Sequence, residues 1–175
     1  MVIETAFFNM SRELYRLAEI ERECLFLQDR YGLNVNVLLF CLWHGRQGRD
    51  VLVTAFFEEV MSALEQWHET VVLPIRRARR QIKTVDTPWI APDERDEIRR
   101  GVLNAEIAAE VGEQKILIRV FDAKRHASAS STSADRRSVS QANLLAYAQA
   151  RQLDDEPEVA ASFRRLVTAA GAIAE

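Results

Sequence analysis

The feature that most constrains the fold is the stretch LNVNVLLFCLWHG, residues 33–45, which has no polar face after Asn36. A helix that is apolar on all sides has to be buried on all sides. A buried strand is the alternative, because Val35 and Val37 suit β-structure, but the sequence offers no second strand of comparable quality to pair with it. We therefore predict an all-α fold, a compact bundle of roughly five or six helices around this central apolar helix.

The segment before this run is predicted to be a helix with one apolar face and a defined C-terminal end. Four of its residues are spaced by four, three and four positions and share one helical side: Ile20, Cys24, Leu27 and Tyr31. Gly32 follows directly and is typical of the left-handed residue that ends a helix. Further upstream, the amphipathic segment of residues 3–17 is predicted to be interrupted near residues 9–11, where Ser11 would cap a new start.

Prolines divide the second half of the chain. Helical periodicity runs from Val51 to Pro74, and proline predicts a kink or break just before it because it lacks a backbone donor and clashes with the preceding turn. The helix is expected to resume through residues 75–83. After the connector TVDTPWIAPD, Pro92 with the acids behind it indicates the start of a last long helix.

The composition changes after Asp122, so we expect three parts: a helical domain of residues 1–122, a Ser/Ala-rich flexible linker of residues 123–140, and a short helical C-terminal extension of residues 141–175. A capping box of Ser138 and Gln141 would open the extension. Its final segment carries an apolar stripe: Val159, Phe163, Leu166 and Val167. This stripe needs a partner surface, either on the body of the chain or on another subunit.

Bulk properties exclude several classes of protein. The chain has 175 residues and a formal charge of -3, which argues against a general nucleic-acid binder. The apolar run of residues 35–43 is far shorter than the roughly 20 residues that cross a membrane, and the N-terminus lacks the basic region of a signal peptide. Cys24 and Cys41 lie in apolar patterns and are expected to be buried reduced thiols. We therefore expect a cytoplasmic location and no membrane association.

Polar residues gather at the entrance to the apolar run. Asn34 suits the N-cap of the central helix, and Asn36 lies in its first turn. Asp29 lies near the end of the preceding helix, where the helix dipole disfavours an anion, so a cation should compensate it. The obvious source is the basic segment of residues 76–83, and we expect Asp29 to pair with one of Arg76, Arg79 or Arg80.

Gln28 or Asn36 would complete this network. The network serves either as a structural latch or as the lining of an anion-binding pocket, and a solvated basic face or an RNA-phosphate contact is the remaining alternative. The candidate ligand-binding residues are Gln28, Asp29, Asn34, Asn36, Trp43, Arg76, Arg79 and Arg80.

Other chemistry has weaker signals. Glu65 and His68 have the Glu-x-x-His spacing that supplies half of a di-iron site, but the second half is missing. The only further carboxylates at helical spacing are Glu106, Glu110 and Glu113. His44 is expected to cap the end of its own helix as a cation. There is no glycine-rich phosphate loop and no nucleophile elbow, so we predict no catalytic residues, no metal and no cofactor.

Two motifs carry a family resemblance. The stretches CLFLQDRYGLNVNVLLFCLW and PIRRARRQIK are similar to patterns close to C-L-x-L-Q-D-x-x-G-x-x-V-N-x-L-L-F-x-x-W and P-L-R-x-x-R-R-x-L-K. These patterns are typical of an uncharacterised proteobacterial helical family. The chain departs from them at Ile75 and Ile82, where the family has leucine. The resemblance covers about residues 5–121. It implies a helical fold and a bacterial origin, but no activity and no catalytic residues.

Two classes of function remain. The favoured one is a non-enzymatic helical protein-interaction or adaptor protein, which binds an unknown protein partner or associates with itself. The alternative is a small-molecule or anion-binding protein, possibly an enzyme, with Asp29, Asn36, Arg76 and Arg80 around a pocket. The two differ in whether these side chains face a cavity or satisfy one another.

Overall fold

A computed structural model describes residues 2–125 and 135–172, and within these ranges the chain is helical without any β-strand. This confirms the predicted all-α fold. The elements, in chain order, are α1 Val2–Tyr15, α2 Ala18–Tyr31, α3 Val35–Arg46, α4 Thr54–Trp67, the π-helical turn η1 His68–Val72, α5 Leu73–Thr84, α6 Pro92–Arg125, α7 Arg136–Ala150 and α8 Pro157–Ala170.

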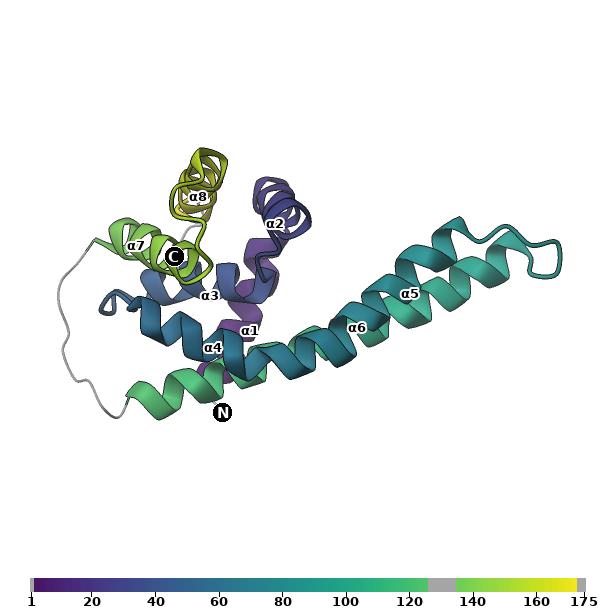
Figure 1. Ribbon diagram of the computed structural model, residues 1–175, viewed down its shortest axis with the longest axis horizontal. Coiled ribbons are helices and arrows are strands. Elements are labelled where there is room, and N and C mark those ends of the chain that lie inside the picture. Colours follow the sequence, from purple (N-terminus) through teal and green to yellow (C-terminus); the bar gives the residue numbers. More distant parts are fainter. Residues whose placement is uncertain (1, 126–134, 173–175) are drawn as a thin grey trace.

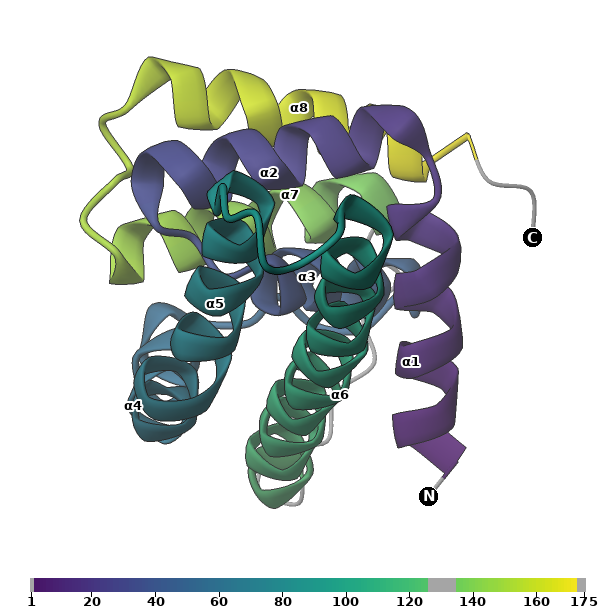
Figure 2. The ribbon, with the colours of Figure 1, turned by 90° about the vertical axis from the view of Figure 1, so that its right-hand side faces the viewer.

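The molecule consists of a helical body and a projecting arm (Figure 1). The arm is an antiparallel hairpin in which α5 pairs with the first half of α6. The body holds the other helices, and the second half of α6 passes beneath it. Figure 2 looks along the arm toward the body, where α2 and α8 lie side by side. None of the helices in the described ranges combines the length and the apolar character needed to cross a membrane.

Helix α3 is the centre of the body, as its composition predicts. All ten residues from Asn36 to Gly45 are buried, and α7 and α1 cover the helix. Its start is fixed by Asn34, whose side chain accepts hydrogen bonds from the backbone amides of Asn36 and Val37. The predicted end of α2 is also confirmed, because Gly32 has φ 65°, a conformation that glycine adopts without steric cost.

The irregularity predicted before Pro74 is the π-helical turn η1. Here the backbone amide of Leu73 donates to the carbonyl of His68, five residues back. Proline has no amide to offer the preceding turn, and the wider turn accommodates its ring, so α4 continues into α5 without a break.

Three local predictions are corrected. Helix α1 runs without interruption through residues 9–11, where the Ser11 hydroxyl donates to the Phe8 carbonyl inside the helix. Helix α7 begins earlier than the predicted capping box, because the carboxylate of Asp135 accepts from the amide and hydroxyl of Ser138. The predicted linker is shorter at both ends, since α6 reaches residue 125 and α7 starts at residue 136. Residues 126–134 of that linker lie outside the described residues.

The C-terminal helices pack onto the body. Helix α7 lies against α3, and α8 lies against α2 and α7. The apolar stripe of α8 is buried in the same hydrophobic cluster as α3: Val159, Phe163, Leu166 and Val167. The partner surface that this stripe requires is therefore supplied by the same chain. Cys24 and Cys41 are buried free thiols, as predicted.

Candidate functional site

The two helices of the arm are joined at its base by a network of charges. The Arg76 guanidinium donates to Glu106 at 2.9 Å and to Glu110 at 2.6 Å. Arg79 donates to both carboxylate oxygens of Glu106. Glu106 is buried, and Arg76 is nearly so. Planar guanidinium groups match carboxylates in this way, and the resulting pairs fix the register of α5 against α6.

The two carboxylates of this network differ in electrostatics. Burial alone would raise the pKa of Glu106, but the hydrogen bonds from Arg79 and Arg76 outweigh it and hold that pKa below its ordinary value. Glu110 receives a hydrogen bond from Arg76 alone, and burial keeps its pKa above the ordinary value. Glu106 is therefore the stable counter-ion of both arginines.

A second polar network, centred on Glu113 of α6, lies where the arm meets the body. Asn36 Nδ2 donates to Glu113 Oε2 at 2.7 Å, and Asn34 Nδ2 donates to Oε1 at 3.0 Å. His68 Nδ1 lies 2.6 Å from the same Oε1. Asparagine amides from the start of α3 and the first residue of the π-helical turn thus converge on one buried carboxylate.

The network extends to α1 and α7. Gln114 Nε2 donates to Asn36 Oδ1 at 2.9 Å and to Ser11 Oγ at 3.2 Å. The backbone amide of Asn34 donates to the Tyr147 hydroxyl of α7 at 2.9 Å. Five elements are therefore tied together around the N-terminus of α3. Within the described ranges, two buried side-chain atoms have no hydrogen-bond partner: Gln114 Oε1 and Arg99 Nε.

The predicted pairing of Asp29 is present but lies on the surface. Arg80 Nη2 is 2.8 Å from Asp29 Oδ1, and the two side chains are 56% and 57% exposed. Among the described residues, neither Gln28 nor Asn36 hydrogen-bonds to Asp29, and Asn36 belongs to the Glu113 network instead. The predicted single cluster is therefore divided into a surface pair and two separate networks.

The roles predicted for Trp43 and His44 are corrected, because both side chains are buried. Trp43 lies in the apolar core, with its ring 5.4 Å from those of Phe7 and Phe40, and it takes no part in the polar networks. His44 is buried with its Nδ1 3.2 Å from Asn143 Nδ2. Burial lowers the pKa of His44 to about 4, and Arg49 acts in the same direction, so His44 is neutral rather than a cationic cap.

The Glu65/His68 pair has no matching set of metal ligands among the described residues. His68 contacts Glu113, whereas Glu65 is exposed and forms no ion pair with the described residues. No group of three or more potential metal ligands is present in the described part of the chain.

The partners of these arginines and asparagines were not predicted from the sequence. Those partners are Glu106, Glu110 and Glu113, whose spacing of four and three places them on one face of α6. Arg76 and Arg79 lie in the preceding helix, and a short connector makes two helices antiparallel neighbours. This combination of spacing and topology is the signal that identifies the pairs.

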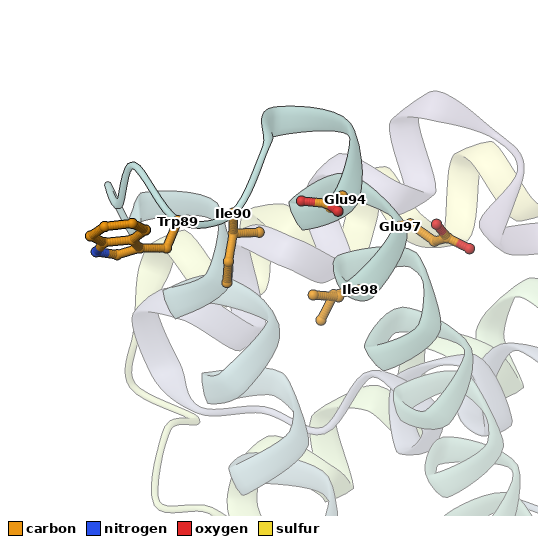
Figure 3. Close-up of a pocket in the computed structure, with 5 residues that line it drawn as sticks. All are labelled: Trp89, Ile90, Glu94, Glu97 and Ile98. Carbon is orange, nitrogen blue, oxygen red and sulfur yellow. The ribbon is translucent and has the colours of Figure 1, made fainter.

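The tip of the arm presents apolar side chains to solvent (Figure 3). Trp89 is 89% exposed, Ile98 is 49% exposed and Ile90 is 40% exposed. Together with Glu94 and Glu97 they line an open hollow of about 520 Å³. Ile90 of the loop and Ile98 of α6 point toward each other across it, while the Trp89 ring projects outward. This segment was predicted only to be a connector between two helices.

Residues 6–117 match the family described as "Protein of unknown function (DUF2390)", so the chain belongs to that family. The matched region contains α2 to α5 and the charge networks of α6, and it ends before α7. Comparison with curated proteins and comparison with solved structures gave no match.

Proposed function

We propose that this protein has a non-enzymatic protein-interaction or adaptor role and that the tip of the α5–α6 arm is its contact surface. One observation carries the proposal: the polar groups at the base of the arm satisfy one another, whereas the apolar side chains at its tip are uncovered. Large exposed aromatic and aliphatic side chains on a projecting element are typical of interaction surfaces.

The geometry weighs against a pocket around the predicted ligand-binding residues. Arg76 is occupied by Glu106 and Glu110, and Asn36 is occupied by Glu113 and Gln114. An incoming anion would have to displace a buried carboxylate from its arginine partners, which is costly. These contacts support an architectural role for the networks, with the arm held rigidly against the body.

We also propose that the protein acts in the cytoplasm on a protein partner rather than on a membrane or nucleic acid. Two buried free cysteines suit a reducing compartment. The net charge of -3 disfavours phosphate backbones and anionic lipid surfaces.

Site-specific photo-crosslinking in cells tests the proposal. Benzoylphenylalanine in place of Trp89 keeps an aromatic side chain at the tip, and the same residue in place of Glu58, an exposed residue of α4, is the matched control. We expect a discrete protein adduct from position 89 and none from position 58. The additional substitution Ile98→Asp should remove the adduct. No adduct at position 89, or identical adducts from both positions, would refute the proposal.

Native mass spectrometry of the purified protein separates this function from the alternative. A mass equal to that of the chain or its oligomer agrees with an interaction role. Extra mass that wild type loses on denaturation, and that is absent from native Arg76→Lys, would instead support a ligand-binding pocket at the base of the arm.

A further inference from the structure

Hydrogen bonds hold the loop at the tip of the arm in place. Arg95 Nη1 donates to the Val85 carbonyl at 2.9 Å and so closes the loop across its base. The amide of Ala91 donates to Glu94 Oε2 at 2.9 Å, which caps the start of α6. Trp89 therefore lies on an ordered loop, and the entropic cost of ordering this loop when a partner binds is small.

The tip also concentrates negative charge. Residues 85–98 contain five carboxylates and one arginine, a net charge of -4, while the whole chain carries -3. The remainder of the chain is therefore net positive by one. Four of these carboxylates are exposed and form no ion pair with any described residue: Asp86, Asp93, Asp96 and Glu97. The single arginine, Arg95, is engaged with the loop carbonyl.

Apolar side chains surrounded by unpaired carboxylates select the chemistry of a partner. An apolar side chain can fill the hollow between Ile90 and Ile98 and pack on Trp89, which is the kind of anchor that dominates binding energy. Lysine or arginine side chains next to that anchor would meet the carboxylates and steer the approach. Phosphates and anionic lipid headgroups would be repelled, and so would the acidic tip of a second copy.

We infer that the arm tip binds a basic amphipathic segment of a partner protein, in which apolar side chains on one face are flanked by lysine or arginine. This inference rests on the proposed interaction role and deepens it by naming the chemistry of the partner.

Three synthetic peptides of about 18 residues test the inference. The first is an amphipathic helix of leucine and lysine, the second has glutamate in place of every lysine, and the third has serine in place of every leucine. Fluorescence anisotropy of each labelled peptide is measured with the full-length protein at about 50 mM and 300 mM salt. We expect binding of the leucine–lysine peptide only, with affinity that falls as salt rises.

Three variants locate the binding. Trp89→Ala should lower the affinity for the leucine–lysine peptide by roughly tenfold or more, because an exposed aromatic anchor is lost. Glu97→Gln should lower this affinity by about threefold at low salt and should reduce its dependence on salt, as expected for the loss of one exposed charge pair. Glu58→Gln removes the same charge from α4, far from the tip, and should leave the affinity unchanged.

Several results would overturn the inference. Equal binding of the leucine–glutamate or serine–lysine peptide would show that the apolar face and the positive charge are not both required. Unchanged affinity in Trp89→Ala would place the site elsewhere. Sedimentation that shows a dimer in wild type and a monomer in Trp89→Ala would identify the occupant as a second copy.

The peptide result and the crosslinking result are separable. A specific adduct at position 89 without binding of the leucine–lysine peptide would refute the partner chemistry and leave the interaction role intact. Absence of both would refute both.

Discussion

Gly45 lies at the closest approach of α3 and α7, and replacing it with alanine gives a sharp test of this packing. A methyl group at Gly45 would overlap the Ser140 hydroxyl and would lie 2.6 Å from the Ser140 amide nitrogen and 2.7 Å from its Cα. The hydroxyl can rotate away, but the nitrogen and Cα belong to the backbone of α7. The helix itself would therefore have to move.

The size of the effect follows from these distances. Non-bonded carbon atoms pack at roughly 3.5–4.0 Å, so α7 must retreat from Gly45 by about 1 Å. That movement loosens the buried contacts of Leu144 and Tyr147 with the core. Overpacking of this kind costs about 3 kcal/mol at the upper end of its usual range, and the better helix propensity of alanine returns about 1 kcal/mol. We expect Gly45→Ala to lower the free energy of unfolding by about 2 kcal/mol.

Chemical denaturation measures this difference, and Gly101→Ala is the matched control. Gly101 also lies inside a helix, but a methyl group there would have no atom within 4 Å. This substitution should raise the free energy of unfolding by about 1 kcal/mol through helix propensity alone. The same chemical change is thus expected to have opposite signs at two helical positions.

The double variant Gly45→Ala/Ser140→Ala separates the two kinds of contact without adding a glycine to α7. It removes the hydroxyl but leaves the backbone nitrogen and Cα of α7 in place, so stability should not be restored. Full restoration, or a Gly45→Ala variant as stable as wild type, would refute the close backbone packing of α3 and α7.

Three further predictions concern charge and exposure. Glu106→Gln leaves two arginines without their shared anion and should lower the free energy of unfolding by about 3 kcal/mol. Asp29→Asn, at the exposed pair with Arg80, should lower it by less than about 1 kcal/mol. Urea unfolding of both variants measures this contrast, and equal losses would contradict it. His44 is neutral in the fold, with a pKa of about 4 against an ordinary 6.5, so the unfolded state binds the proton first. Stability should therefore fall by about 3 kcal/mol as the pH drops from 6.5 to 4, and a pH series should show a flatter profile for His44→Gln than for wild type. Trp89→Ala should leave the melting temperature within about 1 °C of wild type, because the side chain is almost fully exposed; a large drop in thermal unfolding would mean that the tip packs on the body.

Sequence patterns predicted the elements of the fold well where a local rule was sufficient. Asn34 and Gly32 act through atoms within a few residues of themselves, and the cap and the helix end that they indicate are both present. The continuous apolar run had only one all-α solution, a central helix. Ser138 shows the limit of such rules, because it was predicted to cap α7, whereas Asp135, three residues earlier, caps the helix in the structure.

Side-chain pairing was harder to predict because it depends on which faces meet. Asp29 and Asn36 are close in sequence, yet Asp29 faces Arg80 at the surface while Asn36 faces Glu113 inside. The rotation of α2 relative to α3 decides this, and no periodicity within either helix encodes it. Exposure of Trp89 was also not predictable, because a single aromatic residue in a connector packs or projects according to the length of the helices that carry it.

The contact of α3 with α7 also has a consequence for the order in which the chain acquires its structure. The amide of Asn34 and the hydroxyl of Tyr147 are 113 positions apart, and this hydrogen bond lies at the edge of the interface that covers the central helix. Contacts between residues so distant in sequence form late, because a long loop must close before they stabilise anything. During synthesis, the most apolar helix of the protein leaves the ribosome well before its main cover does, so the nascent chain exposes the apolar surface of α3 that α7 later buries.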